Sequence, residues 1–82
     1  MSIKESVLNY FANKRALSGS EDEKLRIRYL NEGIIDSMGI IDLITYFEEQ
    51  YQIQFEADDL QSEEFQTIGG LVQILERLSS EK

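Results

Sequence analysis

Apolar residues recur at helical spacing in three separate segments, and this periodicity restricts the possible folds more than any other feature of the chain. The segments are residues 2–15, residues 38–51 and a stretch from Thr67 to about Leu78. Side chains three and four positions apart share one face of a helix, so each segment can bury one apolar face. The sequence therefore predicts an all-α fold.

The intervening residues predict connectors and one short helix. Residues 16–35 are polar at their start and predict a long loop with a helical turn near 21–28. Residues 53–57 alternate like a strand, but a single strand has no partner here, so we expect an extended connector. Residues 58–64 predict a short helix. The expected architecture is a small four-helix bundle with three main helices and one short one.

The missing residue types restrict both structure and chemistry. The 82 residues contain no proline, no cysteine and no histidine. Disulfides, thiolate chemistry and an imidazole base are therefore excluded, and we expect neither catalytic residues nor a metal site. The length predicts one domain over residues 1–82. The apolar runs are short, so the sequence predicts neither a membrane span nor a signal peptide, and we expect a cytoplasmic protein.

Acidic residues dominate the second half of the chain. Sixteen acidic and eight basic residues give a net charge of −8. Eleven of the acidic residues and no lysine or arginine lie between Glu32 and Glu76. This charge repels nucleic acids and anionic membranes and attracts proteins that have basic patches. We therefore expect a monomer with basic protein partners, without nucleic acid binding or membrane insertion.

The stretch GIIDSMG, residues 33–39, contains a serine at the predicted start of the second main helix. Either Asp36 or Ser37 can occupy the N-cap position there. A helix N-terminus has unpaired amide donors and a positive dipole end, and both suit a phosphate ester on Ser37. A serine that only caps the helix is the alternative interpretation.

Three local patterns together resemble the acyl carrier and peptidyl carrier superfamily. They are Asp36-Ser37-Met38, similar to the family's Asp-Ser-Leu attachment motif, Glu48-Glu49 followed by Tyr51 and Ile53, and Phe65-Gln66-Thr67-Ile68. The order of the predicted helices also resembles this superfamily, over almost the whole chain. A motif becomes informative when its structural context is also present.

The resemblance implies that Ser37 receives a 4′-phosphopantetheine arm from a phosphopantetheinyl transferase. It further implies that the arm holds acyl or aminoacyl groups as thioesters for a ligase and for synthases of fatty-acid, polyketide, peptide or other specialised biosynthesis. Asp36 is then expected to help the transferase recognise the site, with helix capping as the alternative. The residues expected to contact partner proteins lie on the same helix: Met38, Ile41, Asp42, Glu48 and Glu49.

Two departures from the commonest fatty-acid carriers leave the cargo open. Gly33 precedes the serine by four residues, and Gly39-Ile40-Ile41 follows the motif where a polar residue usually stands. The stretch GIIDSMGII is more similar to stand-alone specialised carriers that work with a dedicated ligase. Lys24, Arg26 and Arg28 in the long loop suggest a particular partner, or serve solubility alone.

Two other interpretations compete with a carrier, and a cation site is also considered. An acidic helical adaptor without a prosthetic group would leave Ser37 unmodified. A small enzyme has little support, because no paired catalytic groups are visible. The acidic residues 58, 59, 63 and 64 lack the ligand spacing and central glycine of an EF-hand, so they predict weak cation binding at most.

Overall fold

The computed structural model describes residues 2–80, which form five α-helices and one 3-10 helix. The long helices are α1 (Ile3–Lys14), α3 (Ser37–Tyr51) and α5 (Ile68–Ser80). The short ones are α2 (Glu21–Leu25), α4 (Ala57–Gln61) and the 3-10 helix η1 (Glu63–Gln66). No strand occurs within residues 2–80, and the predicted all-α class is confirmed. Residues 1, 81 and 82 of the predicted domain lie outside the described residues.

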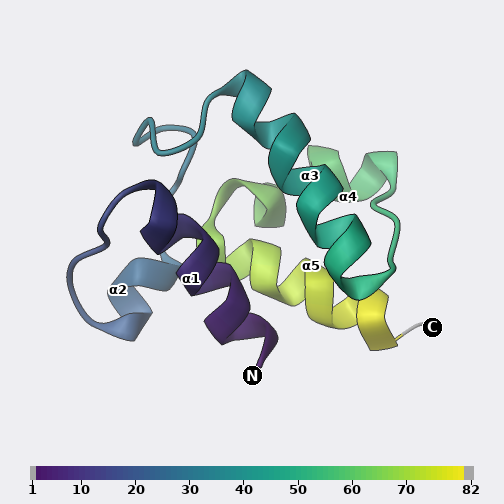
Figure 1. Cartoon of the computed structure of the whole chain (residues 1–82), viewed down its shortest axis with the longest axis horizontal. Helices are drawn as coiled ribbons and strands as arrows, with labels where there is room; N and C mark the ends of the chain where they lie inside the picture. The colour runs from purple at the N-terminus through teal and green to yellow at the C-terminus, as the bar shows by residue number, and fades with distance from the viewer. Residues whose placement is uncertain (1, 81–82) are drawn as a thin grey trace.

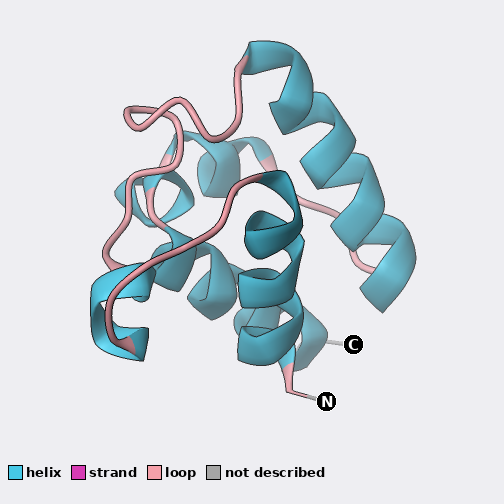
Figure 2. Cartoon of the chain, turned by 60° about the vertical axis from the view of Figure 1, so that its left-hand side comes forward, coloured by secondary structure: helices cyan, strands magenta, loops and turns pink. Residues whose placement is uncertain are grey.

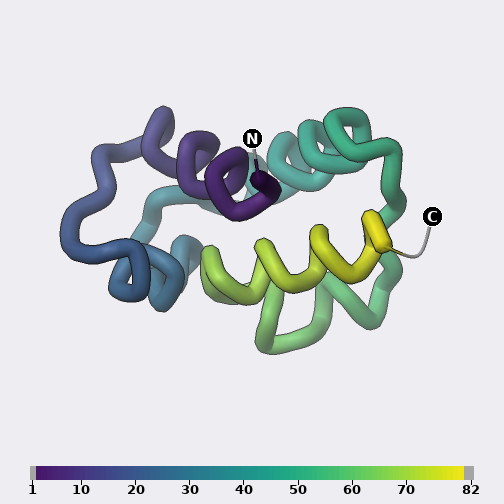
Figure 3. Tube along the Cα trace, turned by 90° about the horizontal axis from the view of Figure 1, so that it is seen from below, coloured from purple at the N-terminus to yellow at the C-terminus, as the bar shows by residue number. Residues whose placement is uncertain are grey.

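Helix α5 is the central element of the bundle. It packs against α1, α2 and η1. In Figure 3, α1 and α3 lie along one side of α5, while the segment that contains η1 lies on the other. Six residues in its first eight positions are buried: Ile68, Gly70, Leu71, Val72, Ile74 and Leu75. Because neighbours surround α5 on several sides, its first two turns form the middle of the core.

Aromatic side chains contribute much of the remaining core. The buried rings come from α1, the α2–α3 loop, α3, the α3–α4 connector and η1: Phe11, Tyr29, Phe47, Phe55 and Phe65. The ring centroids of Phe11 and Tyr29 are 4.9 Å apart, and those of Phe55 and Phe65 are 6.0 Å apart. Aromatic pairs at such distances favour offset or edge-to-face geometry and add stability beyond their buried area. Distant parts of the chain are therefore joined through ring contacts.

The long loop between α2 and α3 is anchored to the segment that precedes α5. The Tyr29 hydroxyl donates a hydrogen bond to the Phe65 carbonyl, and the Ile68 amide donates to the Ile27 carbonyl at 3.1 Å. Tyr29 is fully buried, and burial raises the pKa of its hydroxyl. Figure 2 shows this loop leading to the N-terminal end of α3. These contacts fix the position from which α3 begins.

The observed boundaries confirm the three predicted long helices within one or two residues. The helical turn expected near 21–28 is α2, and Ser20 caps it through the Glu23 amide. The single short helix expected over 58–64 is instead two elements, α4 and η1, separated at Ser62. The Ser62 hydroxyl bonds to the Asp59 carbonyl at 2.8 Å, which closes α4 there. Within residues 2–80, no helix is long and apolar enough to cross a membrane.

Candidate functional site

Ser37 is the first residue of α3, at the upper end of this helix in Figure 1. Asp36 is the N-cap residue, and its Oδ1 accepts a hydrogen bond from the Gly39 amide at 2.8 Å. The sequence allowed either Asp36 or Ser37 as the N-cap residue, and in the structure the N-cap is Asp36. Ser37 is exposed, and its hydroxyl makes no hydrogen bond to the described part of the chain. The serine is thus available to a second molecule.

The start of α3 suits a negatively charged group on Ser37. The amides of a first helical turn lack intrahelical carbonyl partners, and the helix dipole places positive partial charge there. Asp36 satisfies the Gly39 amide, and its carbonyl accepts from Ile40 at 3.0 Å. The Ser37 and Met38 amides precede these two in the same turn. A phosphate ester on Ser37 therefore fits the donors at this helix end.

Exposed apolar side chains adjoin the serine. Met38 is 76% exposed and Ile41 is 66% exposed, the two largest values among the exposed large hydrophobic residues. Asp42 is exposed next to Ile41. On the opposite face of α3, Leu43 and Phe47 are fully buried. The two most exposed large apolar residues, Met38 and Ile41, therefore lie within about a turn of Ser37, where a second molecule can contact them.

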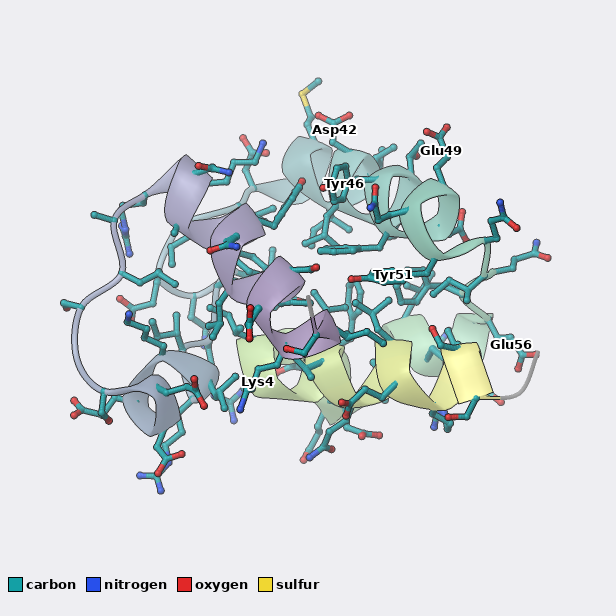
Figure 4. All side chains as sticks on the ribbon, turned by 60° about the horizontal axis from the view of Figure 1, so that its bottom comes forward. Lys4, Asp42, Tyr46, Glu49, Tyr51 and Glu56 are labelled. Atoms are coloured by element: carbon teal, nitrogen blue, oxygen red, sulfur yellow. The ribbon has the colours of Figure 1, made fainter. Side chains whose placement is uncertain are left out.

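The two glutamates near the end of α3 have different surroundings. Glu48 is half-buried, and its Oε2 accepts a hydrogen bond from the Phe55 amide at 2.9 Å. Glu49 is exposed and lies on the outer side of α3, as does Asp42 (Figure 4). Glu48 thus fastens the connector after α3, while Glu49 remains accessible. Of the predicted partner contacts, Met38, Ile41, Asp42 and Glu49 are exposed.

Among the acidic residues of α4, Asp59 makes a structural contact. Asp59 is buried and pairs with Arg77 of α5, and its Oδ2 accepts from the Glu56 amide at 3.1 Å. No group of three or more acidic residues within residues 2–80 is arranged to hold a metal ion. No local sequence pattern indicates this ion pair, because Asp59 and Arg77 are 18 positions apart.

Tyr46 is an exposed aromatic residue of α3 that the sequence interpretation did not single out. It is 45% exposed, and its ring centroid lies 5.0 Å from that of Tyr10 in α1. The residue stands one position before the core residue Phe47, so helical spacing already places it off the buried face. Its position between Asp42 and Glu49 could have been recognised from the same spacing.

The chain was compared with known families, curated proteins and solved structures. A family model described as a phosphopantetheine attachment site matches residues 19–75, well over half of the chain. The matched range includes α2, the long loop, the whole of α3 and most of α5. Neither the curated proteins nor the solved structures gave a match.

Proposed function

This chain belongs to the phosphopantetheine attachment family, and we propose that Ser37 is the residue that carries its 4′-phosphopantetheine group. Domains of this family hold the group covalently on a serine and act as carriers, not as enzymes. The observation that supports Ser37 is its position: an exposed hydroxyl on the first residue of α3, inside the matched range.

Attachment breaks the phosphoanhydride bond of coenzyme A and forms a phosphodiester bond to Ser37. The Ser37 oxygen bonds to the phosphorus that bears the pantetheine arm in coenzyme A, and the bond from that phosphorus to the adenosine bisphosphate breaks. The serine proton passes to a base on the transferase, since this chain has no histidine or cysteine to accept it. The first-turn amides of α3 then face the new phosphate. When bound, the arm supplies a terminal thiol that holds cargo as a thioester.

The exposed side of α3 supports docking of partner enzymes beside Ser37. Met38 and Ile41 give it an apolar centre, and Asp42 and Glu49 give it an acidic border. Charge complementarity speeds encounter and selects orientation, while buried apolar anchors supply most of the affinity. A phosphopantetheinyl transferase, an acyl or aminoacyl ligase and downstream synthases with basic patches fit this surface. The GIIDSMGII stretch favours a specialised carrier with a dedicated loading enzyme.

Intact mass spectrometry tests the attachment. The protein is incubated with coenzyme A, Mg²⁺ and a broad-specificity phosphopantetheinyl transferase. We expect one phosphopantetheine group on the wild type and none on Ser37→Ala. Ser20→Ala is the matched control, because Ser20 is also an exposed serine at a helix start, the N-cap of α2. This variant should be modified like the wild type.

Two results would contradict the proposal. Modification that persists in Ser37→Ala would assign the group to another hydroxyl. A folded wild-type chain that several transferases leave unmodified would instead favour an acidic adaptor that binds proteins through α3 without a prosthetic group.

A further inference from the structure

Three exposed side chains form a line along α3. Asp42, Tyr46 and Glu49 are four and three positions apart, the spacing that places residues on one side of a helix. Figure 4 shows Asp42 and Glu49 on the side of α3 that faces away from α5, while the Tyr46 ring lies toward α1, against Tyr10. An aromatic ring therefore stands between two carboxylates, one about a turn before it and the other about a turn after it.

The bundle holds the Tyr46 ring in place. Its centroid lies 5.0 Å from Tyr10 in a tilted arrangement and 5.0 Å from Phe47 in an edge-to-face arrangement. The pKa of the Tyr10 hydroxyl is raised by burial, by the Asp42 carboxylate and by Tyr46, so Asp42 lies near this aromatic pair. A ring supported on one side and 45% exposed offers its remaining surface without a large loss of side-chain entropy on binding.

The chain itself does not neutralise this surface with an ion pair. The three ion pairs found within residues 2–80 involve neither Asp42 nor Glu49. On α1, the Nζ of Lys14 lies 5.2 Å from the centre of the Tyr10 ring. A groove of about 420 Å³ between α1 and α3 is lined by Lys14, Tyr10 and Tyr46, among others. The Lys14 ammonium therefore supplies a positive charge on the α1 side of the Tyr10–Tyr46 pair. Asp42 and Glu49 supply negative charges on the α3 side.

We propose that Tyr46, with Asp42 and Glu49, forms a binding surface for an arginine side chain of a partner protein. The inference rests on the proposed carrier function for the existence of such a partner. A guanidinium is planar, so it can stack on the Tyr46 ring and still form two parallel hydrogen bonds to a neighbouring carboxylate. A lysine ammonium is a strongly hydrated point charge that lacks this geometry. Tyr46 therefore selects arginine over lysine, while the carboxylates attract both.

Nuclear magnetic resonance titrations of the full chain test the selection. The probes are two helical peptides of identical sequence, one with four arginines on one face and the other with four lysines there. We expect the arginine peptide to bind the wild type about two- to fivefold more tightly, the effect of a cation–π contact of about 0.5–1 kcal/mol. The largest amide shift changes should fall within residues 42–49.

Two variants isolate the ring from the charges. Tyr46→Leu keeps both carboxylates and should bind the two peptides equally, at the affinity of the wild type for the lysine peptide. Tyr46→Phe keeps the ring and should preserve the arginine preference. The double variant Asp42→Asn and Glu49→Gln should bind both peptides more weakly than the wild type does. A preference that persists in Tyr46→Leu would overturn the proposal, and so would its loss in Tyr46→Phe.

Modification at Ser37 is measured on the same samples, so that the two proposals fail separately. A wild type that is modified at Ser37 but binds both peptides equally rejects the arginine surface and leaves the carrier function intact. A wild type that prefers the arginine peptide through Tyr46 but is not modified rejects the carrier function alone. The dispersion of the amide signals in each variant verifies that it is folded.

Discussion

Helices α3 and α5 begin with the same local arrangement. The side chain of Asp36 accepts from the Gly39 amide at 2.8 Å, and that of Thr67 accepts from the Gly70 amide at 2.9 Å. In both helices the capping side chain is three positions before a glycine, and the capping carbonyl accepts the amide four positions on. Such caps satisfy one of the unpaired amides of a first turn.

The surroundings of the two starts are opposite. Residues 36–38 are exposed, whereas Ile68, Gly70 and Leu71 are buried. A Cβ on Gly70 would collide with the Glu64 backbone, while one on Gly39 would meet the Ile35 side chain at 2.8 Å. The same type of N-cap therefore begins a buried helix start in α5 and an exposed helix start, with an exposed Ser37, in α3. The packing around a helix start, rather than the cap, therefore decides whether that start is buried in the core or exposed to solvent.

The strongest test of this contrast is to add one methyl group to each glycine. Gly70→Ala should lower the free energy of unfolding by about 3 kcal/mol or more, since the clashing atoms belong to backbone that cannot rotate away. Gly39→Ala should change it by less than about 1 kcal/mol, because the gain in helix propensity offsets a shift of the Ile35 side chain. Urea unfolding followed by circular dichroism measures both.

Equal costs at the two glycines would break the comparison. The comparison would also fail if the free energy of unfolding of Gly70→Ala were within about 1 kcal/mol of the wild-type value. That result would mean that the start of α5 can move away from η1. Gly39→Ala should still accept phosphopantetheine at the wild-type rate, because the added methyl group lies toward Ile35 and Asp36 and leaves the Ser37 hydroxyl exposed.

Tyr29 joins the two regions, because its loop leads to α3 and its hydroxyl bonds to Phe65 just before α5. Tyr29→Phe retains the ring but leaves a buried carbonyl without this donor. We expect a loss of about 1–3 kcal/mol in the free energy of unfolding. Tyr46→Phe is the matched control, since Tyr46 is 45% exposed, and it should change stability by less than about 0.5 kcal/mol. Equal effects would deny Tyr29 its anchoring role.

Alkaline pH should weaken the same anchor. Burial raises the pKa of the Tyr29 hydroxyl above its ordinary value, so the folded state favours the neutral phenol. The contribution of the Tyr29 hydroxyl to the free energy of unfolding is complete below its pKa in the unfolded chain, about 10. As the pH rises above that value, this contribution falls by about 1.4 kcal/mol per pH unit. Urea titrations between pH 8 and pH 11 should therefore show the gap between wild type and Tyr29→Phe narrowing as pH rises. A constant gap would contradict this.

The sequence predicted the parts of the molecule that depend on local spacing. Helical periodicity located α1, α3 and α5, and the capping residues indicated where α3 and α5 begin. It did not predict that Asp59 would be buried against Arg77, or that Tyr29 would reach Phe65 across 36 positions. Such contacts depend on how helices pack, and no local pattern encodes them. The expectation that Ser37 receives a phosphopantetheine arm likewise came from the family resemblance and not from helical spacing.

The smallest effects concern the caps themselves. Asp36→Ala and Thr67→Ala should each lower the free energy of unfolding by about 1 kcal/mol, the usual value of an N-cap. Thr67→Ala should cost more of the two, because Gly70 is buried and its amide has less access to water. The two variants are compared by urea unfolding. A larger loss for Asp36→Ala would mean that the exposed start of α3 carries stability that its surroundings do not explain.

Asp36→Ser separates capping from recognition at α3. Serine also caps helices, so this variant should unfold at nearly the wild-type urea concentration. If the transferase recognises the carboxylate, modification of Ser37 should slow about tenfold or more in Asp36→Ser as well as in Asp36→Ala, a loss of about 1.4 kcal/mol. A wild-type rate in Asp36→Ser would assign Asp36 to capping alone, and the starts of α3 and α5 would then differ only in what packs around them.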